Sequence, residues 1–294
     1  MKKLTNITSK NTMRKLSLII LLLFPAVFVI AQDEEVSDTD NRPARPAFES
    51  AQLVDLQSII VPSAKTLEFD MQHRFGTVEN GISDLYGIYA PGANIRLGFS
   101  YTPISNLSVG FGFMKLKKIV DLNAKYSIIK QRRDWSIPVS VTYYGNTAID
   151  TRAPENFDKE VHRLSFYNEL IIAARITPKI SLQISPSFSH HNAVDSLYQN
   201  DMIAVAIAGR YKFSAQSSIL VGYVQQVTKH DDPNFDLQPG VSLGWEIATS
   251  SHAFQIFITN FQGILQQENI AYNQFDFTKG DILIGFNITR LWNF

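Results

Sequence analysis

The 294-residue chain contains no cysteine. This excludes disulfide bridges, thiolate metal sites, a cysteine nucleophile and a lipid-modified N-terminal cysteine. The chain also has no excess charge, because 27 basic residues balance 27 acidic ones. A broad surface for nucleic acid is therefore not expected. After Ala31, no apolar run is long enough to cross a membrane as a helix.

The one long apolar run lies near the N-terminus, where residues 16–30 follow the basic pair Arg14 and Lys15. At about 15 residues it is shorter than the roughly 20 that a spanning helix needs. A basic start, a short apolar run and a small residue at Ala31 are typical of a secretory signal peptide. We predict that residues 1–31 are this signal and that cleavage follows Ala31.

Residues 32–62 form a predicted leader between the signal and the rest of the chain. Residues 32–47 are polar, charged and proline-bearing, which predicts a disordered segment in the periplasm. Residues 48–62 mix apolar and polar positions without one period. They are compatible with a short helix at a barrel mouth, a small plug or an extra strand, and the sequence leaves these three open.

From residue 63 to residue 294 the pattern changes to strict alternation of apolar and polar residues, the period of a β-strand. In residues 67–74, for example, Leu67 and Phe69 share one face while Glu68 and Asp70 share the other. Counting that segment, alternation predicts twelve strands. The other eleven segments are 94–101, 107–114, 120–128, 137–143, 164–172, 180–189, 203–211, 219–223, 241–247, 254–258 and 282–294.

The connections between these segments alternate between short and long, as in outer-membrane barrels. The predicted short turns, none longer than six residues, are 103–106, 130–135, 177–179, 214–217 and 250–252. The predicted long connections are 75–92, 145–161, 190–200, 229–238 and 261–279, and the link 115–118 alone breaks the rule. If Phe294 ends the last strand in the periplasm, the short turns are periplasmic and the long connections extracellular.

Energetics decide which face of each strand meets lipid. A Lys or Arg at the bilayer midplane costs roughly 2–4 kcal/mol, so the apolar rows must face hydrocarbon. An open sheet edge would leave unpaired backbone amides in lipid, so the sheet must close. We predict an all-β fold, a transmembrane antiparallel up-and-down β-barrel of about 12 strands over residues 63–294. A signal peptide and a short periplasmic leader precede it, and the barrel lies in the outer membrane.

Several phrases of the sequence point to a family. They are HRFG (73–76), GANIRLGFSY (92–101), PSFSHHN (186–192), AGRYKF (208–213) and GFNITRLWNF (285–294). With them, residues 48–294 resemble a domain-of-unknown-function family of Gram-negative outer-membrane β-barrel proteins. The resemblance implies the barrel fold and recognition of the C-terminal strand, ending at Phe294, by the barrel assembly machinery. It implies no activity and no functional residues.

The inward-facing rows contain a balanced set of charges, which are the candidate site residues. They are Glu68, Asp70, Arg74, Arg96, Asp121, Lys125, Arg163, Glu169, Arg210, Lys212, Glu246 and Asp281. One interpretation is a narrow polar channel with a charge-lined constriction. The other is an interior filled by ion pairs and hydrogen bonds, because buried charges need partners. Balanced signs favour the filled interior.

Metal binding and catalysis have little support in the sequence. His190, His191 and Asp195 are the one local group of metal-type ligands, but adjacent histidines of a strand point to opposite faces. Ser189, His190 and Asn192 are close in sequence, yet no nucleophile elbow is present and a triad is defined by geometry. We assign no catalytic residue, metal ligand or cofactor.

The sequence therefore predicts a porin-like barrel that conducts small polar solutes through a narrow lumen. An alternative is a non-transporting structural or docking barrel, with residues 32–62 contacting a periplasmic or membrane partner. A second alternative is an outer-membrane hydrolase. The expected partners are outer-membrane lipid and the assembly machinery, and no nucleic acid is expected.

Overall fold

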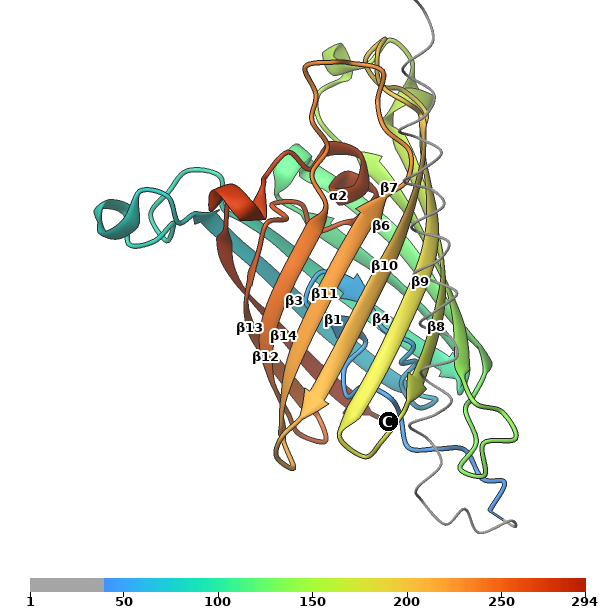
Figure 1. Cartoon of the computed structure of the whole chain (residues 1–294). Helices are drawn as coiled ribbons and strands as arrows, with labels where there is room; N and C mark the ends of the chain where they lie inside the picture. The colour runs from blue at the N-terminus through green and yellow to red at the C-terminus, as the bar shows by residue number, and fades with distance from the viewer. Residues whose placement is uncertain (1–39) are drawn as a thin grey trace, which may run out of the picture.

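The computed structural model describes residues 40–294, which form a closed antiparallel barrel of twelve strands (Figure 1). The predicted signal peptide and the first part of the leader lie outside the described residues. Each strand pairs with the next along the chain, and the last pairs with the first to close the wall. The wall strands are β3 (Thr66–Thr77), β4 (Asn94–Ile104), β5 (Leu107–Met114), β6 (Ile119–Ile129), β7 (Ser140–Asp150), β8 (Leu164–Arg175), β9 (Ile180–His191), β10 (Asp201–Lys212), β11 (Ser217–Gln226), β12 (Gly240–Ala248), β13 (His252–Thr259) and β14 (Leu283–Asn293).

The predicted up-and-down barrel is thus confirmed. Closure pairs Trp292 with Leu67 at one end of β14 and β3, and Leu283 with Thr77 at the other. None of the helices within residues 40–294 is long and apolar enough to cross a membrane.

The strand that differs most from its prediction is the fifth. The fifth segment was placed at 137–143, but β7 begins at Ser140 and continues to Asp150, into the range predicted as a long connection. Pro138 lacks the backbone N–H that a ladder needs, so the strand begins after it. The turn before it spans 130–139, longer than the six residues expected, and it also contacts the N-terminal segment. Ala44 N donates to Gln131 O (2.8 Å) there.

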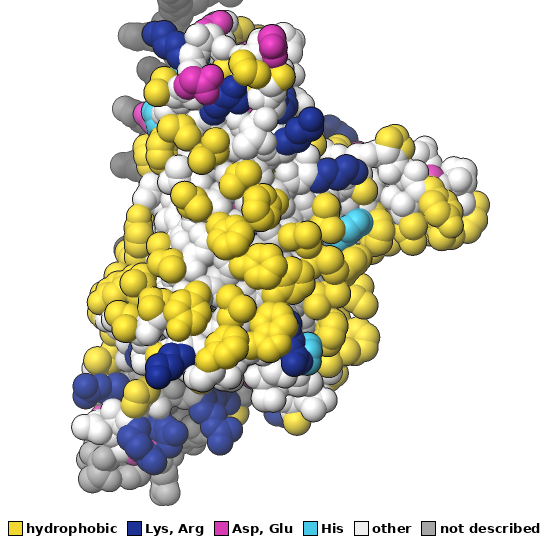
Figure 2. Space-filling view, turned by 180° about the vertical axis from the view of Figure 1, so that it is seen from behind, with side chains coloured by type: hydrophobic (Ala, Val, Ile, Leu, Met, Phe, Trp, Pro, Cys, Tyr) yellow, Lys and Arg dark blue, Asp and Glu magenta, His cyan; other side chains and the backbone are white. Residues whose placement is uncertain are grey.

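Alternation along the strands separates a polar interior from an apolar exterior. On β4, Leu97, Phe99 and Tyr101 are 36–41% exposed, whereas Asn94 and Arg96 are buried. Apolar side chains cover much of the outer wall on the face shown in Figure 2. Such a surface is costly in water and favourable against hydrocarbon, so the apolar rows form a lipid-facing belt.

The two ends of the barrel differ. Phe294 and residues 40–44 lie at the end with the short turns, where Phe294 N donates to Lys65 O. The long connections at the other end carry most of the short helices. These are the 3₁₀ helices η2 (Gly81–Asp84), η3 (Leu116–Lys118), η4 (Pro154–Asn156), η5 (Glu160–Arg163) and η6 (Phe277–Lys279), and the α-helix α2 (Gln266–Tyr272).

The lumen is occupied by the chain itself. Residues 48–62, which we call the plug, lie inside the wall, where β1 (Gln52–Leu53) and β2 (Leu56–Gln57) form a small hairpin separate from the barrel sheet (Figure 1). Of the three structures compatible with this segment, the fold shows the plug. At the other end, α2 folds inward from the β13–β14 connection, and six of its seven residues are buried.

Candidate functional site: a plugged polar lumen

One face of the plug is apolar and packs on the wall. Leu53, Val54, Leu56 and Ile59 are 1–7% exposed. They belong to one core cluster with inward-facing residues of β7, β8, β10, β11 and β13, among them Ile171. Burying an aliphatic side chain of this size contributes about 1.5–3 kcal/mol, so this face supplies a large share of the plug's affinity for its seat.

The other face of the plug is polar and centres on Asp55. Arg74 Nη2 of β3 lies 2.8 Å from Asp55 Oδ1, and the two side chains are 0% and 2% exposed. Thr259 Oγ1 donates to the second Asp55 oxygen at 2.6 Å, and Asn287 Nδ2 donates to Val54 O at 2.9 Å. Removing one member of such a buried pair costs about 3–5 kcal/mol, because the other charge is left uncompensated.

A second polar contact joins the plug to β12 and β13. Ser50 Oγ lies 2.6 Å from Glu246 Oε2, and Gln255 Nε2 donates to Gln52 O at 2.8 Å. Gln255 also accepts from Val54 N at 3.1 Å. Since the plug's backbone groups cannot reach water inside the lumen, these wall side chains supply the hydrogen bonds that the small hairpin leaves unmade.

A third cluster lies on β3, β4 and β6, beside the hairpin. Arg96 of β4 bridges Asp70 of β3 at 2.7 Å and Asp121 of β6 at 2.8 Å, and all three side chains are at most 8% exposed. Gln52 of the plug donates to Asp70 at 3.1 Å. Arg96 therefore forms ion pairs with two buried carboxylates at once, and one of these, Asp70, also contacts the plug.

The bridge requires glycine in the strands around it. A Cβ on Gly98 would lie 2.0 Å from Asp70 Oδ2, and one on Gly112 would lie 2.3 Å from Arg96 Nη2. Both distances are far below van der Waals contact. These inward positions of β4 and β5 are thus left empty so that the guanidinium can cross β5 to reach Asp121.

The outer end of the lumen is closed by α2. Glu268 lies 2.5 Å from Lys117 Nζ and 3.7 Å from His191 Nε2. Gln267 donates to Asn146 of β7 at 2.8 Å, and Gln266 donates to Asp55 O at 3.2 Å. The last contact joins α2 directly to the plug, so the lumen has a two-part stopper.

Burial by itself would raise the pKa of Glu268, but His191, whose Nε2 lies 3.7 Å away, and the charge of Lys117 outweigh it and hold the pKa below the usual 4.5. A carboxylate with a lowered folded-state pKa stabilises its contacts above its unfolded pKa and loses that stabilisation as the pH falls through the folded value. We expect α2 to stay docked near neutral pH and to loosen only below about pH 4.

Hydrogen–deuterium exchange of residues 266–272, corrected for the intrinsic rate, measures this loosening. Glu268→Gln is the matched control, since its exchange should already be raised at pH 7 and should change little on acidification. If residues 266–272 were equally protected in the parent protein and in Glu268→Gln at every pH, the role given to Glu268 would be contradicted.

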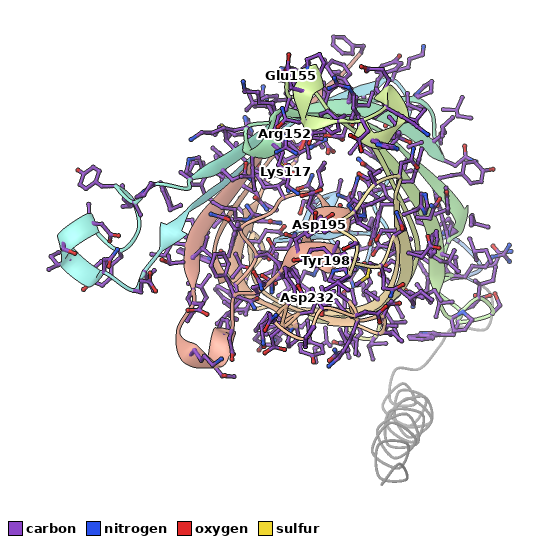
Figure 3. The ribbon with its side chains drawn as sticks, turned by 90° about the horizontal axis from the view of Figure 1, so that it is seen from above. Lys117, Arg152, Glu155, Asp195, Tyr198 and Asp232 are labelled. Carbon is purple, nitrogen blue, oxygen red and sulfur yellow. The ribbon has the colours of Figure 1, made fainter. Side chains whose placement is uncertain are left out.

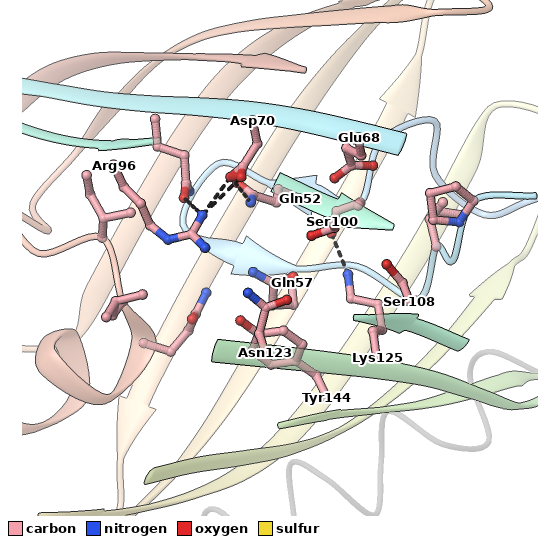
Figure 4. Close-up of a pocket in the computed structure, with 17 residues that line it drawn as sticks. Gln52, Gln57, Glu68, Asp70, Arg96, Ser100, Ser108, Asn123, Lys125 and Tyr144 are labelled. Carbon is pink, nitrogen blue, oxygen red and sulfur yellow. Dashed lines mark hydrogen bonds and ion pairs between the residues drawn. The ribbon is translucent and has the colours of Figure 1, made fainter. Parts of the chain in front are cut away.

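Two of the cavities formed by residues 40–294 lie beside the stopper. One, between the plug and β3 to β6, has a volume of about 30 Å³, room for about one or two waters (Figure 4). The other is an outer vestibule of about 480 Å³ with Lys117, Arg152, Glu155 and Asp195 among its lining residues (Figure 3). Leu265 and Gln266 line the first cavity and Glu268 and Tyr272 line the second, so α2 lies between the two.

Nine of the twelve candidate charges are buried in the lumen, and three are not. The buried ones are Glu68, Asp70, Arg74, Arg96, Asp121, Lys125, Glu169, Arg210 and Glu246. Arg163 lies at the outer rim, where it donates to the carbonyls of Asp150 and Arg152. Lys212 pairs with Glu49 at the short-turn end (2.6 Å), and Asp281 accepts from Asp276 N within a long connection. Lys212 is the last residue of β10, whereas Arg163 and Asp281 lie in the connections just before β8 and β14, so all three are at the rims.

Sequence reasoning missed Asp55, Glu49 and Glu268, the partners that the plug and α2 supply. They lie in segments with no strand period, so no signal marked them as inward-facing.

The histidine pair behaves as the strand geometry requires. His190 faces outward and its Nδ1 lies 2.7 Å from Asp201 Oδ1, whereas His191 is buried. Ser189 is also buried, so Ser189 and His190 lie on opposite sides of the wall. Within residues 40–294 no three His, Asp or Glu side chains are grouped as a metal site.

Comparison with solved structures returns barrels of the same class. The chain is similar to the NanC porin, at 10% identity, 78% of this chain, 99% of that chain and a TM-score of 0.47. It is also similar to the KdgM porin, at 9% identity over 78% of this chain and 99% of that chain, with a TM-score of 0.46. A third similar structure is an outer membrane channel from Pseudomonas putida F1, at 11% identity over 79% of this chain and 97% of that chain, with a TM-score of 0.46. No match was found among curated proteins.

A family model described as a membrane-bound β-barrel domain, DUF5777, matches residues 48–292. The match begins with the first residue of the plug and ends in the last wall strand, so it covers the stopper and the barrel together. The family predicted from the sequence phrases is thereby confirmed, and the chain belongs to the membrane-bound β-barrel domain family DUF5777.

Proposed function

We propose that this protein is a gated outer-membrane conduit for small polar solutes, closed by its own plug. The observation that carries the proposal is the polar wall behind the plug. Buried charges and amides are costly when unpaired, and several of those in the wall, among them Arg74, Lys125 and Glu246, are paired with plug groups. When the plug leaves, water can solvate these side chains, and the wall becomes the lining of an aqueous passage.

The inner face of β9 supports the same proposal. Its inward row consists of Ser181, Gln183, Ser185, Ser187 and Ser189, all buried. A barrel that is permanently filled has no need of a serine-rich wall, since aliphatic side chains pack better in a dry core. Small hydroxyl and amide groups, by contrast, suit contact with water and with hydroxylated or amide solutes.

A docking barrel is the second candidate, and the route of the N-terminal segment favours it. Residues 40–47 leave the lumen at the short-turn end, where Pro43 bridges to Arg132 and Glu49 pairs with Lys212 and Arg210. A partner that binds the leader on that side could act on the plug through this segment. The two functions differ in whether the lumen ever conducts.

Deleting residues 48–62 separates the two. In planar lipid bilayers we expect the intact mature protein to be mostly closed and the deletion variant to form long-lived conducting pores, because the wall cannot fill the vacated space by itself. The control is heat-modifiable migration in detergent gels, which shows that the shortened barrel has folded. A folded deletion variant without channel events would reject the conduit and leave the docking barrel.

A further inference from the structure

The β3–β4 connection, residues 78–93, projects sideways from the outer end of the wall, whereas the tallest connections stand above the barrel mouth (Figures 1 and 3). We call it the lateral arm. It does not reach over the vestibule, and none of its residues lines either of the two cavities described above. Its position therefore gives it no part in closing or lining the lumen.

The arm exposes large apolar side chains. Ile82 and Tyr89 are 75% and 77% exposed, and Leu85, Tyr86 and Ile88 are 38–51% exposed. The arm carries no basic residue, and its two acidic ones are Glu79 and Asp84. Five large apolar side chains on one short segment exceed what a water-exposed loop normally presents, and such patches mark contact with another phase or molecule.

The arm also has a fixed shape that keeps these side chains outward. Leu85 and Tyr86 have φ values of 53° and 55°, a left-handed conformation that side-chain-bearing residues rarely adopt. Tyr86 N donates to Gly81 O at 2.7 Å, Tyr89 N to Asp84 O at 3.0 Å, and Gly87 N to Asp84 Oδ1 at 2.9 Å. Strained backbone persists only where the surroundings enforce it, so this exposure is built into the fold.

The root of the arm is joined to the wall by close backbone contact. Gly76 N donates to Gly87 O at 2.9 Å, and a Cβ on Gly87 would lie 2.3 Å from Gly76 O. At the same end of β3, outward-facing His73 stacks on Phe286 at 5.1 Å, and Phe75 lies 6.0 Å from that ring. The apolar surface of the arm thus continues the lipid-facing belt.

We propose that the lateral arm lies on the bilayer and inserts Ile82, Tyr86 and Tyr89 at the boundary between headgroups and acyl chains. Continuity with the belt identifies the occupant as lipid, because any body that covers the arm must also meet the membrane beside it. Tyrosine is enriched at this boundary, where its ring lies in apolar surroundings and its hydroxyl reaches water. The arm would fix the tilt and rotation of the barrel, whether or not the barrel conducts.

The absence of cysteine allows a direct test. A nitroxide spin label is attached to Tyr89→Cys in protein reconstituted into phosphatidylcholine vesicles, and its accessibility to oxygen and to a water-soluble nickel chelate is measured. We expect a label at 89 to be rich in oxygen contact and poor in nickel contact, like a label at Leu97→Cys on the lipid-facing belt. Val161→Cys, 55% exposed in the β7–β8 connection, is the matched control and should show the reverse.

Ile82→Cys provides a second, independent position should Tyr89→Cys not fold. A label at 89 or 82 that is as accessible to nickel as the label at 161 would overturn the proposal. A label protected from both reagents would also overturn it, because the occupant would then be protein, such as a second copy of this chain. Heat-modifiable migration establishes that each labelled barrel is folded.

Discussion

Asp55→Asn is expected to raise the open fraction of the barrel by roughly 100-fold to a few thousand-fold. The substitution leaves Arg74, which is 0% exposed, without a charge partner while the plug is seated. The cost of about 3–5 kcal/mol falls on the closed state alone, since water reaches Arg74 once the plug has left. Each 1.4 kcal/mol changes an equilibrium about tenfold. Open probability in planar bilayers, recorded with intact mature protein, measures the change.

Two further variants make this experiment specific. Asp201→Asn, on a 63% exposed carboxylate outside the lumen, is the matched control and should conduct like the parent. Adding Arg74→Gln to Asp55→Asn removes the unpaired charge and should restore much of the closure, since replacing both partners of a buried pair costs far less than removing one. A barrel that stays as closed with Asp55→Asn as without it would show that this pair does not hold the plug.

Arg96→Gln is expected to have the largest effect on the stability of the wall. Asp70 and Asp121 both depend on this guanidinium, and both are nearly inaccessible to water. Leaving two carboxylates uncompensated should cost at least the 3–5 kcal/mol that is typical of one broken buried pair. The expected result is a marked fall in the urea midpoint for unfolding from lipid vesicles, or failure to form the heat-modifiable species.

Arg152→Gln serves as the comparison, because it is the same substitution in a different setting. Arg152 is 41% exposed and pairs with Asp150 at the outer rim. Exposed pairs contribute about 0–1 kcal/mol, so this variant should unfold near the parent's midpoint. Similar losses in the two variants would mean that burial of the Arg96 bridge is not what makes it important.

The wall of this protein could be predicted from the sequence to within a few residues. Alternation identified twelve strands because each wall residue meets one of two environments, lipid or lumen, and the sequence records which. At β7 the predicted start was too early because Pro138 interrupts the ladder, and the predicted end was too early because β7 continues to Asp150. Asp70 and Arg96, which alternation places on the inward rows, are both buried.

The plug could not be identified in the same way. Residues 50–59 are all buried, so both sides of this segment meet protein. A segment enclosed on all sides has no reason to alternate, and its mixed pattern is compatible with several structures. The same holds for α2, in which Gln266, Gln267 and Glu268 are buried although they are polar. Their burial follows from partners on the wall and cannot be seen in the local composition.

By itself, the sequence determined the strand class, the inward or outward row of most wall residues, and the family. Only the tertiary structure decided which charges meet, that Asp55 neutralises Arg74, and that the lumen is closed. Period 2 states that a side chain points inward but not which inward side chain lies opposite, since that depends on strand stagger around the closed wall. The plug and α2 supply further partners for the wall charges, and these partners lie outside the wall strands. No local sequence pattern marks them as inward-facing.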